Sequence, residues 1–113
     1  MRKTTAPQPD PTTPAATNAA GTEEEPLRIA SESDPNKVAG ALAGLVREDK
    51  RIIFAVAIGA AADHQLVKAV AIAKGYLAPS ALTLMMSPAF GMTVVDGRRL
   101  TTMKHTIYAV RAR

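Results

Sequence analysis

Apolar residues change their spacing several times between residue 27 and residue 113, and each change predicts a different element. Leu27–Ser31 alternates apolar and polar residues, which is typical of a short, half-buried strand. The next apolar residues recur at helical spacing and predict one buried stripe. This stripe consists of Val38, Ala41, Leu42, Leu45 and Val46.

The start of this first helix is marked by residues that favour helix N-termini. Ser33 or Asp34 can accept a hydrogen bond as the N-cap, and Pro35 suits the first turn. Gly40 and Gly44 lie four residues apart inside the helix, where each glycine costs up to about 1 kcal/mol relative to alanine. We therefore expect a neighbouring element to approach the backbone closely at these two positions.

A central strand and a second helix follow. Arg51–Ile58 is almost continuously apolar and β-branched, which predicts a central strand that is covered on both faces, or on one face by this chain and on the other by a partner. Gly59 breaks this pattern, and Ala60–Tyr76 has helical spacing with apolar residues nearly all round, which predicts a helix buried on two sides. Its main stripe consists of Leu66, Ala69, Val70, Ala73 and Leu77.

The last third of the chain predicts a hairpin. Ala81–Met86 has strand character, and Pro88 interrupts it, which fits a bulge or an edge position. Extended structure resumes at Gly91–Val95, Asp96–Gly97 is a strong two-residue turn signal, and Arg98–Val110 predicts the final strand. The order is β-α-β-α-β-β, which predicts an α+β two-layer sandwich with a four-stranded mixed sheet and both helices on one face.

Residues 1–26 differ in composition from the rest. They contain five of the eight prolines, many Thr and Ala residues, and almost no large apolar side chain. Such a segment buries too little surface to offset the entropy of ordering it, so we expect 1–26 to be a disordered tail. The folded domain is then 27–113, which is small enough that oligomerisation would help to stabilise it.

The charge is divided unevenly between these two parts. The tail has two basic and four acidic residues, for a net charge of −2, whereas residues 27–113 have 12 basic and six acidic residues, for +6. A basic domain favours polyanions such as nucleic acid, although many ordinary proteins are equally basic.

The longest apolar run, Ile52–Ala62, has 11 residues, whereas a membrane span needs roughly 20. With no signal peptide pattern, we expect a soluble cytoplasmic protein that does not bind membranes.

The hairpin arm, Phe90–Met103, is the best candidate for a contact with nucleic acid. Arg98 and Arg99 lie beside its turn, and paired guanidinium groups on a flexible arm can enter a groove or bind phosphates. The alternative is a solvated hairpin tip that only keeps an edge strand from aggregating.

The second helix offers another candidate site. Gly59 precedes its N-terminus, where free amides and the helix dipole can hold a phosphate, and Lys68 and Lys74 lie on the same helix, with Lys37 on the first. The alternative is an ordinary tight turn with no ligand. Because the specific nucleotide-binding motifs are absent, a backbone phosphate fits better here than a bound nucleotide.

No pattern of catalytic residues is evident. The chain has no cysteine, and His64 and His105 are its only histidines, so we expect neither a disulfide nor a metal site. Neither a serine triad nor a nucleophile elbow can be identified. Two Tyr and two Phe, widely spaced in the chain, predict no aromatic platform for RNA. We expect a protein without enzymatic activity and without a cofactor.

Several separated segments resemble the stage V sporulation protein S family. They are Ser33–Gly44, Ala57–Ala60, Gln65–Tyr76, Leu77–Ser80, Pro88–Phe90 and Asp96–Gly97. The resemblance covers nearly all of 27–113 and none of the tail. It implies a role in bacterial sporulation or developmental regulation and a fold similar to that of Alba-type nucleic-acid-binding proteins, which work as dimers.

The comparison with Alba-type proteins has one exception. Those proteins carry a lysine pair just before the first helix, whereas this chain has Ser31-Glu32-Ser33-Asp34, whose acidic side chains would repel phosphate. Two functions therefore remain open: a regulatory dimer that binds DNA or RNA, and a structural or signalling homo-oligomer that binds protein partners without nucleic acid.

Overall fold

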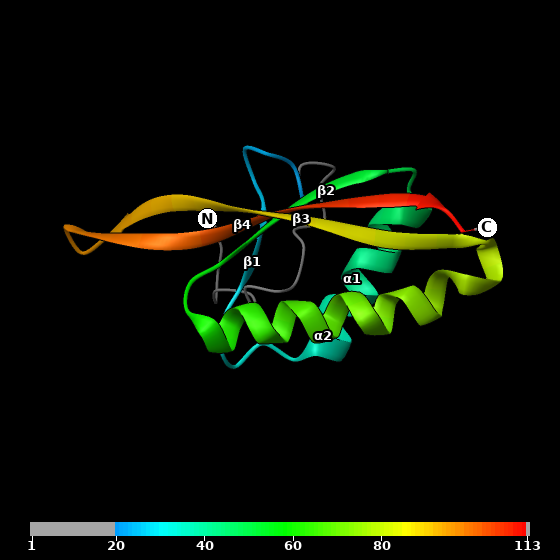
Figure 1. Cartoon of the computed structure of the whole chain (residues 1–113), viewed down its shortest axis with the longest axis horizontal. Helices are drawn as coiled ribbons and strands as arrows, with labels where there is room; N and C mark the ends of the chain where they lie inside the picture. Colours follow the sequence, from blue (N-terminus) through cyan, green and yellow to red (C-terminus); the bar gives the residue numbers. More distant parts are fainter. Residues whose placement is uncertain (1–19, 113) are drawn as a thin grey trace, which may run out of the picture.

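The computed structural model describes residues 20–112 and contains a four-stranded sheet with two long helices (Figure 1). Its elements are β1 (Leu27–Ile29), α1 (Pro35–Arg47), β2 (Ile52–Ala57), α2 (Ala60–Leu77), a short 3-10 helix (Ala78–Ser80), β3 (Leu82–Val95) and β4 (Arg98–Arg111). The predicted order β-α-β-α-β-β is therefore confirmed. None of the described helices is long and apolar enough to span a bilayer.

The sheet is mixed, with the strand order β1-β2-β4-β3. β1 pairs parallel with β2, and β4 pairs antiparallel with both β2 and β3. β1, β2 and β3 therefore share one direction, and the α2 connection carries the chain across β4. Both helices lie against one face of the sheet, as predicted, and the opposite face has no helix (Figure 1).

The first helix begins as its sequence predicts. The Asp34 carboxylate accepts a hydrogen bond from the Asn36 amide at 2.9 Å, and Pro35 occupies the first turn. The other predicted cap, Ser33, has a different role, because its buried hydroxyl accepts a hydrogen bond from the Ala30 amide at 2.8 Å. Ser33 thus holds the turn that leads from β1 into α1.

The expected close approach at Gly40 and Gly44 is wrong for the single chain. Within residues 20–112, and apart from the adjoining residues and nearby backbone of α1 itself, no atom comes within 4 Å of the position that a Cβ would take at either glycine. Both glycines lie outside the buried stripe, which includes Val38, Leu42 and Leu45, and so they do not face the core.

The core lies between the helices and the inner face of the sheet. Its largest fully buried side chains are Val38, Leu42, Ile53, Leu66, Leu77 and Ile107. Each such side chain contributes roughly 1.5–3 kcal/mol by leaving water. The predicted stripe of α2 is buried throughout, but the expectation of two buried sides is not met in the single chain, because Val67 and Ala71 are exposed.

The predicted interruption at Pro88 is also wrong. β3 is continuous for 14 residues, and its pairing with β4 runs without a break from Leu82↔Arg111 to Val95↔Arg98, including Pro88↔His105. β3 is an edge strand, as the alternative interpretation of Pro88 required. Every second amide of an edge strand points away from the sheet, so a proline can be placed there without losing a hydrogen bond to β4.

The ordered part of the chain begins earlier than the composition indicated. Residues 20–26, which we assigned to the tail, form a turn against β2 that we call the strap. The Gly21 carbonyl accepts a hydrogen bond from the Phe54 amide at 2.7 Å, and the Gly21 amide donates to the Glu25 carbonyl at 2.9 Å. The strap covers part of the β2 edge that the three-residue β1 leaves open. The prediction of disorder for residues 1–19 lies outside the described residues.

Gly21 gives a test of the strap. Its φ is +80°, and an added Cβ would lie 3.0 Å from Ile53 Cγ2 and 3.1 Å from Leu45 Cδ1. We expect Gly21→Ala to lower the free energy of unfolding by about 1–3 kcal/mol, as measured by urea denaturation.

Gly44→Ala is the matched control, because its Cβ would meet open space inside a helix. We expect this change to raise the free energy of unfolding by about 0.5–1 kcal/mol. Equal effects of the two substitutions would contradict the docked strap.

Candidate nucleic-acid interface

The hairpin arm, Phe90–Met103, projects beyond the rest of the domain (Figure 1). The last residue of β2 that pairs with β4 is Ala57, and its partner is Met103. Beyond that pair the arm strands bind only each other. The five residues Arg98–Thr102 extend it by about 17 Å at roughly 3.4 Å per strand residue. The arm is therefore a two-stranded ribbon, which is exposed on both faces near its tip, whereas Thr102 near its base is buried.

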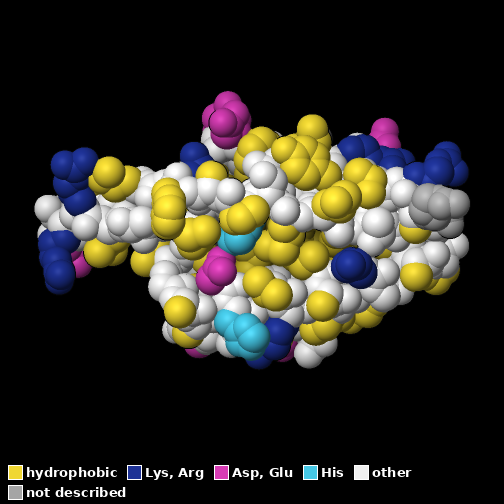
Figure 2. Space-filling view, in the orientation of Figure 1, with side chains coloured by type: hydrophobic (Ala, Val, Ile, Leu, Met, Phe, Trp, Pro, Cys, Tyr) yellow, Lys and Arg dark blue, Asp and Glu magenta, His cyan; other side chains and the backbone are white. Residues whose placement is uncertain are grey.

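The tip of the arm carries the predicted arginine pair. Asp96 and Gly97 form the turn with φ values of 53° and 76°, which are the positive values required by the two-residue hairpin loop we predicted. Arg98 and Arg99 are both exposed, and Arg99 Nε donates a hydrogen bond to Met92 Sδ at 3.0 Å. Figure 2 shows basic side chains at this tip, and a second group of basic side chains at the opposite end of the molecule.

The other predicted cations do not form a single patch with the arm. β1 and β2 run parallel, so the helices that follow them begin at the same end of the sheet. Lys37, in the first turn of α1, and Gly59, the N-cap of α2, are therefore at the arm end. Lys68 lies in the middle of α2 and Lys74 in its last turn, at the opposite end.

Gly59, the predicted phosphate-binding position, lies at a helix N-terminus that already carries a carboxylate. It is exposed, with a φ of 94°, and open space surrounds the position of its missing Cβ. However, the first turn of α2 contains Asp63, whose carboxylate already complements the positive end of the helix dipole. A second anion would be repelled there.

Asp63 also forms a contact that the sequence did not reveal. Its Oδ1 lies 2.6 Å from Nε2 of His105, on β4, and the histidine side chain is only 5% exposed. Within residues 20–112, Nδ1 of His105 has no hydrogen-bond partner. His105 lies on the inner face of β4, the face that also carries Met103, Ile107 and Ala109 at every second position. An inward-facing polar residue in such a pattern signals a buried partner, because buried polar groups are rarely unpaired.

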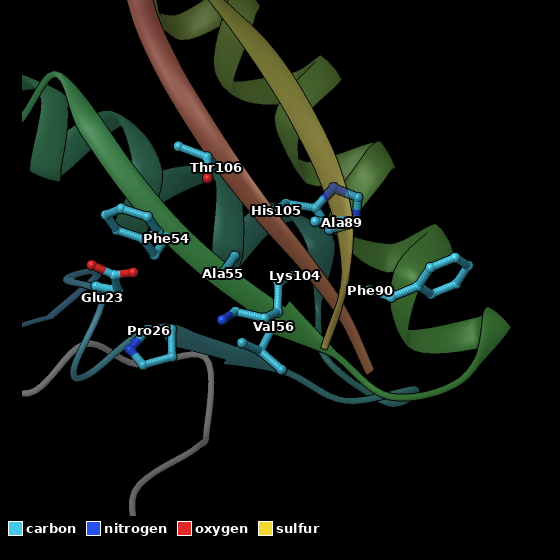
Figure 3. Close-up of a pocket in the computed structure, with 10 residues that line it drawn as sticks. All are labelled: Glu23, Pro26, Phe54, Ala55, Val56, Ala89, Phe90, Lys104, His105 and Thr106. Carbon is cyan, nitrogen blue, oxygen red and sulfur yellow. The ribbon is translucent and has the colours of Figure 1, made fainter. Parts of the chain in front are cut away.

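The sequence also did not reveal a pocket on the open side of the sheet (Figure 3). Its volume is about 190 Å³, and it lies between the strap and strands β2, β3 and β4. Glu23 and Pro26 come from the strap, whereas Phe54, Val56, Lys104 and Thr106 come from the sheet. Ala55, Ala89, Phe90 and His105 complete the lining.

The pocket combines apolar walls with two opposite charges at its rim. Figure 3 shows Phe54 and Pro26 on one side, with Glu23 beside them and Lys104 across the opening. Among the described residues, neither Glu23 nor Lys104 forms an ion pair. No three metal-ligating side chains come together in residues 20–112. The pocket can therefore hold a flat apolar group with polar edges.

The chain matches a known protein family over most of its length. A family model described as Stage V sporulation protein S (SpoVS) matches residues 25–110. The matched range includes both helices, the arm and all four strands except Arg111, the last residue of β4, and it leaves out most of the strap. It agrees with the resemblance found in the sequence.

The Asp63–His105 contact predicts a stability effect. In Asp63→Ala the buried imidazole loses its partner, and we expect the free energy of unfolding to fall by about 1–3 kcal/mol in urea denaturation. Asp63→Asn, which keeps an oxygen acceptor, should lose less. Arg51→Ala removes an exposed ion pair with Asp49 and should cost at most about 1 kcal/mol. If Asp63→Ala is no worse than Arg51→Ala, the contact is not important for stability.

Proposed function

The chain belongs to the stage V sporulation protein S family, and from this premise we propose that it is a regulatory, nucleic-acid-binding dimer. In this proposal it acts in the cytoplasm, in sporulation or developmental gene regulation, and it has no enzymatic activity. Family membership supports the association with sporulation, whereas the mode of binding is argued from the described residues below.

One observation carries the binding proposal: the arm presents Arg98 and Arg99 at the end of a free two-stranded ribbon. A ribbon of this width fits a nucleic-acid groove. Guanidinium groups bind phosphate oxygens through two parallel hydrogen bonds, and each phosphate that they neutralise releases counterions. Lys37, at the same end of the molecule, adds a cation, whereas Lys74 is too remote to share one binding face with the arm.

Exposed apolar surface supports the dimer. Figure 2 shows hydrophobic atoms in a band between the sheet and α2, and the exposed residues of α2 include Val67 and Tyr76. Isolated domains rarely leave contiguous apolar surface in water, and small domains gain stability by covering it. A symmetric dimer would cover this band twice and provide two arms for one nucleic acid.

A second function is favoured by a different feature of the arm. Phe90, Met92 and Val94 alternate along β3 on one face, and they are 82%, 58% and 63% exposed. Such an apolar stripe is typical of surfaces that bind protein. In this alternative the chain is a structural or signalling oligomer whose arms bind protein partners, and the arginines only keep the tip hydrated.

Charge reversal at the tip tests the binding proposal. We expect the double variant Arg98→Glu/Arg99→Glu to bind duplex DNA or RNA at least about tenfold more weakly at low salt. It should also reduce the slope of log affinity against log salt by about two, because two phosphate contacts are lost. Fluorescence anisotropy at several salt concentrations measures both quantities.

The double variant Arg47→Glu/Arg51→Glu is the matched control, because it changes the net charge equally at the other end of the sheet. It should affect affinity much less. If both variants bind alike, the arm is not the contact. If the unmodified chain binds no polyanion at low salt, the binding proposal is wrong and the alternative function is favoured.

The dimer has its own test. Light scattering of the full chain should give twice the chain mass of 11.9 kDa over a wide concentration range. We expect Val67→Glu to shift the protein towards the monomer, because a buried, unpaired carboxylate opposes association. A monomeric mass at high concentration would contradict the dimer.

A further inference from the structure

The open side of the sheet has a binding site that the arm does not explain. We propose that the pocket between the strap and the sheet binds an unpaired base of single-stranded nucleic acid, with a preference for guanine. This inference rests on the proposed function and extends it from phosphate binding at the arm to base recognition in the centre of the sheet.

The walls of the pocket suit a planar aromatic ligand. Phe54, on β2, lines the pocket. Tyr108, on the neighbouring central strand β4, lies outside the pocket on the same open face of the sheet. Phe54 pairs with Thr106, so Tyr108 is its diagonal neighbour, about 7–8 Å away across the sheet. Bases of a single strand stack on aromatic rings arranged in this way. The strand order β2-β4 therefore places two rings that are far apart in the sequence on one face of the sheet, with Tyr108 next to the pocket that Phe54 lines.

The strap makes the site a pocket rather than a flat platform. Pro26 lies at the opening, on the same side as Phe54 (Figure 3). The backbone hydrogen bond from the Phe54 amide to the Gly21 carbonyl holds the strap on β2. With a volume of about 190 Å³, the pocket has room for one base. A base pair in a duplex presents no free face, so this site selects unpaired nucleotides.

The charges at the rim suggest which base is preferred. A carboxylate only accepts hydrogen bonds, and guanine has two adjacent donors, N1–H and the N2 amino group, on its pairing edge. Glu23 can accept from both. Uracil has one donor flanked by two carbonyl oxygens, which would repel the carboxylate. Lys104, across the opening, can bind the phosphate of the same nucleotide.

The position of Lys104 depends on a glycine. A Cβ at Gly91, on β3, would collide with Cγ and Cδ of Lys104 and with the hydroxyl of Thr102. The missing side chain therefore leaves room for the lysine stem to lie across the sheet, and Thr102 is buried beneath it. Gly91, near the base of the arm, thus leaves the space that the Lys104 side chain needs in order to line the pocket.

Titration of the isotope-labelled full chain, followed by NMR, tests the site directly. The probes are the 5′-monophosphates of guanosine, adenosine, cytidine and uridine, and a short single-stranded oligonucleotide with one guanine. We expect the amide signals of Phe54, Val56 and Thr106 to shift most with the guanosine probe. Shifts confined to arm residues, or equal shifts with all four bases, would overturn the proposal.

Two substitutions with matched controls complete the test. Glu23→Gln should weaken guanine binding by at least about fivefold and reduce the preference over uracil, whereas Glu24→Gln, on the neighbouring exposed carboxylate, should change affinity less than twofold. Phe54→Leu should weaken binding to the single strand by at least about fivefold, because a stacked ring is lost. Ile52→Leu on the same strand should not. Since Glu23 is exposed, its substitution leaves the fold intact.

The result separates this inference from the proposed function. If the chain binds duplex through the arm, but Glu23→Gln and Phe54→Leu bind the oligonucleotide normally, only the pocket proposal fails. If no polyanion binds at all, the proposed function fails as well. Binding of the guanosine monophosphate without binding of the oligonucleotide would overturn the assignment to nucleic acid in favour of a free nucleotide.

Discussion

The insertion of β4 between β2 and β3 is the constraint on which the other features of this domain depend. The two-residue turn forces β4 to lie beside β3, and pairing of Ile52–Ala57 with Met103–Tyr108 attaches the same strand to β2. Because β3 and β4 are each 14 residues long and β2 has only six, β3 and β4 extend beyond β2, and on the side of the turn this extension is the arm. The same arrangement brings His105 over α2 and exposes Lys104 on the opposite face.

The helices, strands and turns were predicted well, because each of them is determined by residues that are close together in the sequence. The Asp34 cap, the stripe of α2 and the Asp96–Gly97 turn need only spacing and backbone preference. Long-range pairing was not predictable in this way. Nothing near Asp63 indicates that it meets His105, 42 residues later, and composition alone could not show that Gly21 would bind the edge of β2.

The candidate site followed the same rule. The arginine pair of the arm was evident from sequence, because a hairpin places its turn-flanking residues at a tip. The helix cations were predicted as one group, yet the topology separates Lys74 from the others, since helices that start at one end of a sheet finish at the other. The pocket was missed because its walls come from the strap and three strands, and a one-dimensional pattern contains no information on their meeting.

Mechanically, β4 is a cantilever. From Met103 to Tyr108 it is paired on both sides, and the His105 contact ties this part to α2, whereas the five residues Arg98–Thr102 are paired only with β3. A load applied at the arginine tip must therefore bend the ribbon close to Met103, where lateral support stops. Gly91 lies beside this point on β3, so bending of the arm is concentrated next to Lys104 and is not transmitted through the core.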